Sequence, residues 1–224
     1  MTDTIWADVD RYISGLLIPE DPALDAAQAA SVAAGLPPIS VSPTQGKLLY
    51  LLARVRGAQD ILEIGTLGAY STIWMARALP MSGRLVTLEV DARHAEVATA
   101  NIARAGLSGV VSLRLGPAIE TLPVLHAEGA GPFDFIFIDA DKPSIPEYFD
   151  WALRLSRLGT VIVVDNVVRN GALADAESTD PAVQGVRRFH DLVAREPRVS
   201  ATTLQTVGIK GYDGFTLVLV TEDV

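Results

Sequence analysis

Three oxygen-bearing side chains follow two strongly apolar runs of the chain and could together hold a cation. Asp139 ends the run 133–139, and Asp165 and Asn166 end the run 160–166. Short runs rich in Val, Ile and Phe are typical of buried parallel strands, whose neighbours lie about 4.8 Å apart. If the two strands are neighbours, their carboxyl-terminal ends bring the three side chains together. Oxygen ligands suit a hard divalent cation such as magnesium.

Lys142 lies three residues past Asp139 and could act as a base on a substrate held by that cation. A nearby cation disfavours the ammonium form of a lysine, and a base that works near neutral pH is what deprotonating a phenol requires. The alternative is that Asp and Asn at strand ends cap the following turns and that Lys142 is a solvated surface residue. Two such strand ends together with Lys142 favour the metal site.

A glycine-containing turn, residues 63–71, joins an apolar strand to a helix and could receive a ligand. Gly65 and Gly68 allow close approach to the backbone, and the free amides at the helix start suit a carboxylate or phosphate. The G-x-G-x-x-G spacing of dinucleotide-binding proteins is missing. A tight strand-to-helix turn without a ligand is the alternative interpretation.

Glu89 ends the next strand, 24 residues beyond Gly65. An acidic residue at this place commonly holds the two ribose hydroxyls of a nucleoside; the alternative is a solvated carboxylate. Together with the glycine turn it favours a nucleoside-containing ligand. Glu63 would lie beside a positive group of that ligand, which the pyrophosphate of NAD lacks. S-adenosylmethionine carries both an ammonium and a sulfonium.

The composition of the chain limits the classes of function. Its 224 residues are enough for one sizeable domain, and 49% hydrophobic with 20% charged residues is typical of a globular protein. A net charge of −9 without a basic stripe argues against nucleic acid as a partner. The absence of cysteine excludes disulfides and thiolate zinc sites. The acidic first ten residues do not resemble a secretory signal. No window of about 20 residues is both apolar and free of charge, since the charge-free stretch 26–46 contains three prolines and several polar residues, so we expect a cytoplasmic protein with no membrane partner.

Alternating strands and helices follow residue 60 and predict an α/β fold with a mainly parallel sheet and helices on both faces. The expected strands are 61–64, 84–90, 110–115, 133–139 and 160–165, and the expected helices are 71–79, 92–105, 118–126, 148–158 and 182–195. Two further strands, 201–207 and 215–221, are joined by a connection too short for a helical crossover, which predicts an antiparallel hairpin. Before residue 57 the spacing of apolar residues predicts helices.

The combined motifs resemble those of the cation-dependent O-methyltransferases of the caffeoyl-CoA and catechol O-methyltransferase type, particularly small bacterial members. The resemblance runs from about Val41 to the carboxyl terminus and rests on the turn 63–71, the segment 139–142 and the pairs 165–166 and 170–171. It implies a single domain over residues 1–224 with a class I methyltransferase (Rossmann-like) sheet of seven strands. Residues 1–56 would contribute to the acceptor pocket or a dimer contact, and residues 57–224 would form the core that binds S-adenosylmethionine.

The resemblance also implies a role for individual residues. Asp139, Asp165 and Asn166 match the metal ligands, with magnesium as the expected ion and manganese or calcium as alternatives. Ser71 would bind the methionine carboxylate and Glu89 the ribose. Lys142 matches the proposed base; it, Asp139 and Asn170 match positions that touch substrate. The full set of matched cofactor positions is Val41, Glu63, Gly65, Thr66, Ser71, Glu89, Ala118 and Asp141.

The predicted function is methyl transfer from S-adenosylmethionine to one hydroxyl of a vicinal aromatic diol, in an enzyme that is a homodimer like its relatives. The chain departs from the family pattern at residues 143–148, where Pro143 and Pro146 stiffen the loop and Ile145 replaces a tyrosine. This departure leaves the metal ligands intact and bears on the choice of acceptor. Two alternatives stay open from the sequence: an NAD-dependent oxidoreductase and a non-catalytic cofactor-binding protein.

Overall fold

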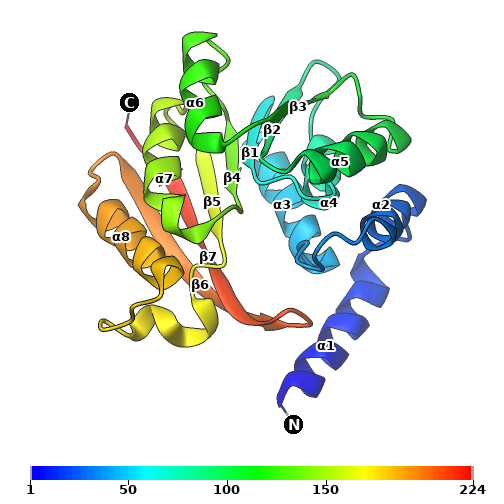
Figure 1. The fold of residues 1–224 in the computed structure, drawn as a ribbon, viewed down its shortest axis with the longest axis horizontal. Helices are drawn as coiled ribbons and strands as arrows, with labels where there is room; N and C mark the ends of the chain where they lie inside the picture. The colour runs from blue at the N-terminus through cyan, green and yellow to red at the C-terminus, as the bar shows by residue number, and fades with distance from the viewer. Residues whose placement is uncertain (1, 223–224) are drawn as a thin grey trace.

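A computed structural model describes residues 2–222 and contains a seven-stranded sheet in the order β3-β2-β1-β4-β5-β7-β6. Strands β1 to β5 pair in parallel, whereas β7 pairs antiparallel with both β5 and β6. The predicted α/β class, the mainly parallel sheet and the terminal antiparallel pair are therefore confirmed. Figure 1 shows the sheet between two groups of helices. The strands are β1 Asp60–Ile64, β2 Arg84–Glu89, β3 Val111–Leu115, β4 Phe135–Ile138, β5 Val161–Asp165, β6 Val199–Gly208 and β7 Gly211–Val220.

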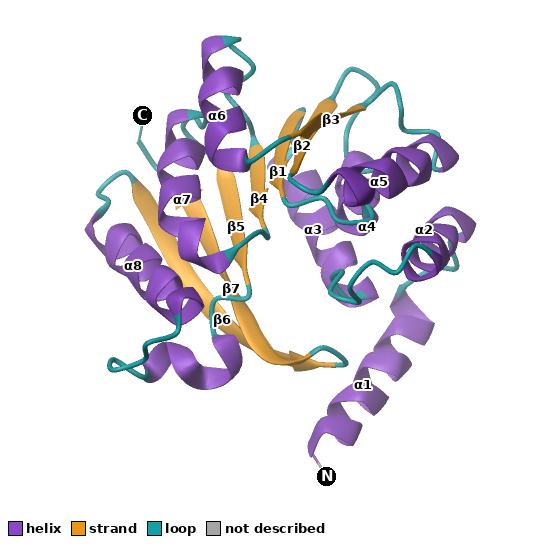
Figure 2. Cartoon of the chain, in the orientation of Figure 1, coloured by secondary structure: helices purple, strands orange, loops and turns teal. Residues whose placement is uncertain are grey.

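Two helical layers cover the sheet, as the cartoon in Figure 2 shows. On one face lie α6 (Ala118–Ala127), α7 (Ile145–Arg154) and α8 (Pro181–Arg195); on the other lie α3 (Pro43–Arg56), α4 (Tyr70–Ala76) and α5 (Ala92–Arg104). Alternate residues of a strand point to opposite faces of the sheet. Because helices cover both faces, the central strands are apolar on both sides. In β4, Ile136 and Ile138 pack in the cluster beneath α7 and α8, while Phe135 and Phe137 pack in the cluster beneath α3 and α4.

Several element boundaries differ from the sequence prediction by a few residues, and two of these differences concern a turn and the start of a helix. The connection expected over residues 208–214 is only a two-residue turn, because β6 and β7 remain paired up to Gly208 and Gly211. Helix α7 begins at Ile145 and not at Tyr148. Pro146 lies in its first turn, where the missing amide proton of proline costs no hydrogen bond.

The predicted amino-terminal helices are present as α1 (Thr2–Leu17), α2 (Pro22–Ala33) and α3. Figure 1 shows α1 extending away from the sheet beyond α2. The Asp10 carboxylate accepts a hydrogen bond from the Ile209 amide at 2.7 Å, so α1 meets the β6–β7 turn. Within residues 2–222, no helix combines the length and the apolar character that crossing a membrane requires. The described residues omit Met1 and residues 223–224, so these ends of the expected single domain lie outside them.

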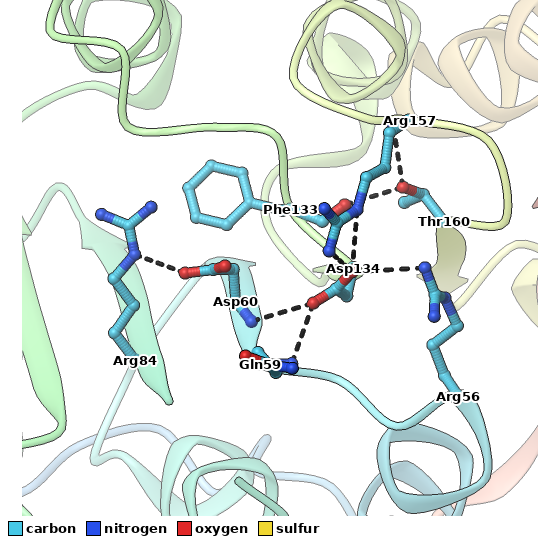
Figure 3. A network of polar contacts seen from close by, with 8 residues as sticks. All are labelled: Arg56, Gln59, Asp60, Arg84, Phe133, Asp134, Arg157 and Thr160. Carbon is cyan, nitrogen blue, oxygen red and sulfur yellow. Dashed lines mark hydrogen bonds and ion pairs between the residues drawn. The ribbon is translucent and has the colours of Figure 1, made fainter. Parts of the chain in front are cut away.

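A buried carboxylate joins the amino-terminal ends of the central strands (Figure 3). Asp134, directly before β4, accepts hydrogen bonds from the Gln59 and Asp60 amides at 2.8 and 3.2 Å. The guanidinium groups of Arg56 and Arg157 pair with the same side chain, which is only 2% exposed. The network therefore fixes the edge of the sheet opposite to the strand ends that carry Asp139 and Asp165.

Candidate active site

Asp139 and Asp165 lie side by side at the carboxyl ends of β4 and β5. Ile138 pairs with Val164 in the parallel register, and each acid directly follows one of these residues. Since paired residues of neighbouring strands are about 5 Å apart, the two acids begin from adjacent backbone positions. The structure thus brings together two of the three predicted metal ligands, and Asn166 follows Asp165 directly in the chain.

The electrostatic state of Asp165 fits a cation at this place. Burial and, to a lesser extent, the negative charge of Asp139 raise the pKa of Asp165 to about 7, against the lowering effects of Lys142, the Asn166 amide and Gln45. A nearly buried carboxylate next to a second one needs positive charge to stay ionised. Two carboxylates and an amide oxygen form a donor set suited to a hard divalent ion, so the residues present fit such a group.

Lys142 points back to the first of these acids. Its Nζ donates a hydrogen bond to Asp139 Oδ1 at 2.9 Å, and its side chain is only 11% exposed. It begins a short 3₁₀ helix, η1 (Lys142–Ser144), against which α8 packs: a Cβ at Gly185 would overlap the Lys142 carbonyl oxygen. Arg188 of α8 also donates to the Pro143 carbonyl at 3.2 Å. The side chain of Lys142 is therefore fixed by its hydrogen bond to Asp139 and is largely shielded from solvent.

The loop after β5 carries the two predicted asparagines in left-handed backbone conformations. Asn166 has φ 55° and Asn170 has φ 54°, a region that Asn tolerates better than most residues. Asp213 of β7 fixes the loop between them by accepting hydrogen bonds from the Val168 and Arg169 amides at 2.9 and 3.0 Å. Asn170 itself is exposed, and its predicted contact with substrate stays a prediction.

The glycine turn after β1 lies against the metal-ligand strand. Gly65 has φ 100°, and a Cβ there would overlap the Asp139 carbonyl oxygen. The Asp139 amide also donates to the Ile64 carbonyl at 2.9 Å. The positive φ and the close approach of the Asp139 carbonyl both require glycine at position 65. The predicted cofactor turn and the predicted cation site are therefore neighbours.

Glu63 is fully buried and is held by three hydroxyl groups. Ser71 donates to Oε1 at 2.6 Å, Thr87 donates to Oε2 at 2.7 Å, and Thr72 also donates to Oε2. Burial raises the pKa of Glu63 to about 7, although the three hydroxyl hydrogen bonds lower it. Among the described residues no Lys, Arg or His pairs with this carboxylate within 4 Å, so a cationic group of a ligand would stabilise its ionised form.

Glu89 faces the same turn from the end of β2. Its Oε2 accepts hydrogen bonds from the Thr66 and Leu67 amides at 3.2 and 2.7 Å, and its Oε1 accepts from the Val90 and Asp91 amides at 3.0 and 2.9 Å. These four donors fix the carboxylate beside the backbone of the glycine turn. Thr66 and Glu89, both predicted as cofactor-binding, are therefore in direct contact.

Three other predicted cofactor positions lie in different surroundings. Asp141 accepts hydrogen bonds from the Tyr148 and Ser144 hydroxyls. Val41 is buried beneath α3 and α4, and Ala118 begins α6 and packs against the opposite layer. The cofactor-binding roles of Val41 and Ala118 stay predictions.

Five residues with contacts in the site were not predicted from the sequence. Gln45 of α3 donates to Asp165, Asp213 holds the β5 loop, Thr72 and Thr87 hold Glu63, and Tyr148 bonds to Asp141. Thr72 and Thr87 carry a weak signal, because they are polar residues inside otherwise apolar elements. Gln45 and Asp213 carry none that indicates their partners, since those lie far away in the chain.

Comparison with known proteins shows to which family this chain is similar. A family model described as O-methyltransferase matches residues 18–220. The chain is 60% identical over 220 residues to a protein named catechol O-methyltransferase from Niastella koreensis, covering 98% of this chain and all of that protein. It is 52% identical to a protein of the same name from Mycobacterium tuberculosis, covering 95% of each.

Solved structures agree with these sequence relatives. An O-methyltransferase from Bacillus cereus in complex with SAH has a TM-score of 0.96 and 56% identity, covering 97% of this chain and 99% of that one. The O-methyltransferase TomG from Streptomyces achromogenes, in complex with SAM, has a TM-score of 0.96 and 55% identity, covering 99% of both chains. These matches favour methyl transfer over the NAD-dependent and non-catalytic alternatives.

Proposed function

Because this chain belongs to the O-methyltransferase family, whose S-adenosylmethionine-dependent chemistry its relatives share, we propose that its acceptor is a vicinal aromatic diol bound through a divalent cation. The observation that carries the proposal is the pair Asp139 and Asp165 on adjacent strand ends, with Asp165 buried and the glycine turn directly beside Asp139. The names of the relatives from Niastella koreensis and Mycobacterium tuberculosis support a catechol.

Asp139, Asp165 and Asn166 would hold the cation, for which magnesium is the proposed ion. When bound, such an ion acts as a Lewis acid that stabilises the phenolate form of a coordinated hydroxyl. Lys142, whose Nζ lies 2.9 Å from Asp139 Oδ1, would in its neutral amine form accept the proton that the hydroxyl releases. The cation ligands would thus orient the diol, and Lys142 would place a base beside it. Positioning of this kind supplies much of the rate acceleration of a transfer reaction.

The methyl donor would occupy the glycine turn. Glu63 faces its positive methionine end, where Ser71 binds the carboxylate, and Glu89 binds the ribose hydroxyls. Gly65 and Thr66 supply the close backbone approach. Val41, Ala118 and Asp141 complete the proposed cofactor contacts, and Asn170 touches the acceptor.

Two features of the whole protein belong to the proposal as well. We assign residues 1–56 to the acceptor pocket or to the contact of a homodimer, which agrees with the exposed apolar residues of α1, among them Ile5, Val9 and Leu16. The proposed location is cytoplasmic, without nucleic acid or membrane partners.

Substitution of the proposed ligand and the proposed base tests the reaction. Asp165→Ala should lower the rate of catechol methylation on the order of 1,000-fold or more, because both diol binding and phenolate stabilisation are lost. Lys142→Met should cost less, roughly 100-fold, as expected for loss of a general base. Product formation is measured by mass spectrometry with magnesium and with a chelator. Asp150→Ala, an exposed acid on α7, is the control and should retain wild-type activity. Equal activity of Asp165→Ala and wild type would contradict the proposal.

A further inference from the structure

Gln45 occupies the third position of α3 but does not make the contact usual for that position. Ser42 caps the helix and accepts a hydrogen bond from the Gln45 amide at 3.2 Å. In the reciprocal capping arrangement of the sequence pattern S-x-x-Q, the glutamine side chain would return to the backbone amide of the cap. Here the carboxamide Nε2 donates to Asp165 Oδ2 at 2.7 Å, across 120 residues of chain. The side chain is therefore directed away from its own helix and toward the cation site.

This contact completes the support of the Asp165 carboxylate. Oδ1 accepts from the Asn166 amide at 2.9 Å, so each oxygen has one protein donor. A carboxylate offers about four acceptor positions on its two oxygens, which leaves positions on both oxygens for a cation. Asp139, in comparison, has Lys142 as its side-chain donor.

We propose that Gln45 is a positioning residue for the cation site: it fixes the Asp165 carboxylate in the orientation that binds the metal. This inference rests on the proposed function, since it concerns the same cation. A carboxamide suits the task because it is a neutral donor and leaves the charge of Asp165 available, whereas a lysine or arginine would neutralise that charge. Partners that orient a ligand in this way typically change metal affinity 10- to 100-fold when removed.

Helix α3 packs closely against α4, and this packing fixes the position of Gln45. A Cβ at Gly46, the next residue, would overlap the indole ring of Trp74 in α4, so the two helices are in close contact at this position. Lys47 also lies over the Tyr50 and Trp74 rings, at 4.7 and 5.8 Å from their centroids. The amino-terminal region, proposed to shape the acceptor pocket, is thereby connected to the cation site through one hydrogen bond.

Manganese binding in the absence of substrate tests the role of Gln45 without an activity assay. Gln45→Met keeps the length of the side chain and removes the donor. We expect its dissociation constant for manganese, measured by titration calorimetry, to rise about 10- to 100-fold, while its affinity for S-adenosylhomocysteine stays within about twofold. Gln184→Met, at an exposed helical glutamine whose side chain donates to the Ser178 carbonyl, should match wild type in both measurements. Gln45→Ala provides a second variant if the methionine variant does not fold.

The outcomes separate the two proposals. Wild-type manganese affinity in a folded Gln45 variant, together with lost binding in Asp165→Ala, would overturn the role of Gln45 and leave the cation site intact. If Asp165→Ala binds manganese as tightly as wild type, the proposed cation site itself would be contradicted. Loss of S-adenosylhomocysteine affinity equal to the loss of manganese affinity would show that Gln45 has only a general structural role.

Discussion

At the scale of single residues, the proposed cofactor site contains an acid that is unusually hard to ionise. Burial raises the pKa of Glu63 to about 7, and Ser71, Thr72 and Thr87 reduce this effect without abolishing it. A carboxyl whose folded pKa is raised binds more protons in the folded state than in the unfolded state. Its contribution to stability is therefore complete below about pH 4.5 and declines as the pH rises to about 7.

Glu63→Gln should remove this pH dependence from the ligand-free protein. The free energy of unfolding of the variant relative to wild type should increase between pH 5 and pH 8 by roughly 3 kcal/mol at most, since one pKa unit corresponds to about 1.4 kcal/mol. Denaturant unfolding at several pH values measures the difference. Asp165 titrates in both proteins, so its contribution cancels. A difference that stays constant over this range would show that Glu63 is ionised throughout.

The predictability of the site from the sequence depends on where each partner lies. Asp139 and Asp165 could be predicted because each ends an apolar run and parallel neighbours align their ends. Gln45 could not, because its position in α3 relative to β5 depends on helix packing. The S-x-x-Q pattern around it favours a different, local partner. Asp213 likewise holds the β5 loop only because β7 pairs with β5.

At the scale of elements, α8 controls the position of the proposed base. The side of α8 that carries Gly185 meets the backbone of η1, and Arg188 donates to the Pro143 carbonyl. Strand and helix patterns predicted α8, but the absence of a side chain at residue 185 gave no indication of its partner. The two prolines near Lys142, seen in the sequence as a departure from the family, lie in η1 and in the first turn of α7.

Gly185→Ala should lower activity by displacing Lys142. Alanine favours a helix over glycine by about 0.5–1 kcal/mol, yet the added Cβ would overlap the Lys142 carbonyl oxygen, and a backbone contact cannot rotate away. Small displacements of a catalytic group cost up to about 100-fold in rate, so we expect kcat to fall about 10- to 100-fold with little change in the KM for S-adenosylmethionine. Gly109→Ala in the turn before β3, whose Cβ would also meet nothing within 4 Å, is the matched control. Unchanged kcat in a folded Gly185→Ala would show that η1 does not depend on this contact.

At the scale of the whole molecule, the two edges of the sheet divide stability from function. At the amino-terminal edge the buried acid, Asp134, is paired with Arg56 and Arg157. At the carboxyl-terminal edge, Glu63 and Asp165 are buried and both have raised pKa values. Asp134 has its cationic partners within the chain, whereas Glu63 and Asp165 have no ion pair among the described residues and need positive charge from a ligand to be stable as carboxylates. The proposed site therefore lies where the fold leaves these two buried acids without a counter-ion.

This division predicts that Asp134→Asn destabilises the protein without changing its ligand binding. Although burial opposes ionisation, the hydrogen bonds from Arg157 and from the Gln59 and Asp60 amides lower the pKa of Asp134 below its ordinary value of 3.8. Its stabilising contribution is therefore complete above about pH 4 and is lost as the pH falls through the lowered pKa. The substitution should cost about 2 kcal/mol, a value reduced from that of a fully buried pair because Arg56 and Arg157 remain partly exposed.

For a chain of this length, that loss lowers the unfolding midpoint by about 4–8 °C. Thermal unfolding followed by circular dichroism should give the same decrease at pH 6 and pH 8 and a smaller one below pH 4. Asp60→Asn is the matched control at the same edge of the sheet, because Asp60 pairs with the half-exposed Arg84 and an exposed pair contributes at most about 1 kcal/mol. The affinity for S-adenosylhomocysteine at 25 °C should equal that of wild type in both variants. An equal loss of stability in the two variants would show that the buried ion pairs of Asp134 stabilise the fold no more than the exposed pair of Asp60. A loss of cofactor affinity in Asp134→Asn would show that the two edges of the sheet are not independent.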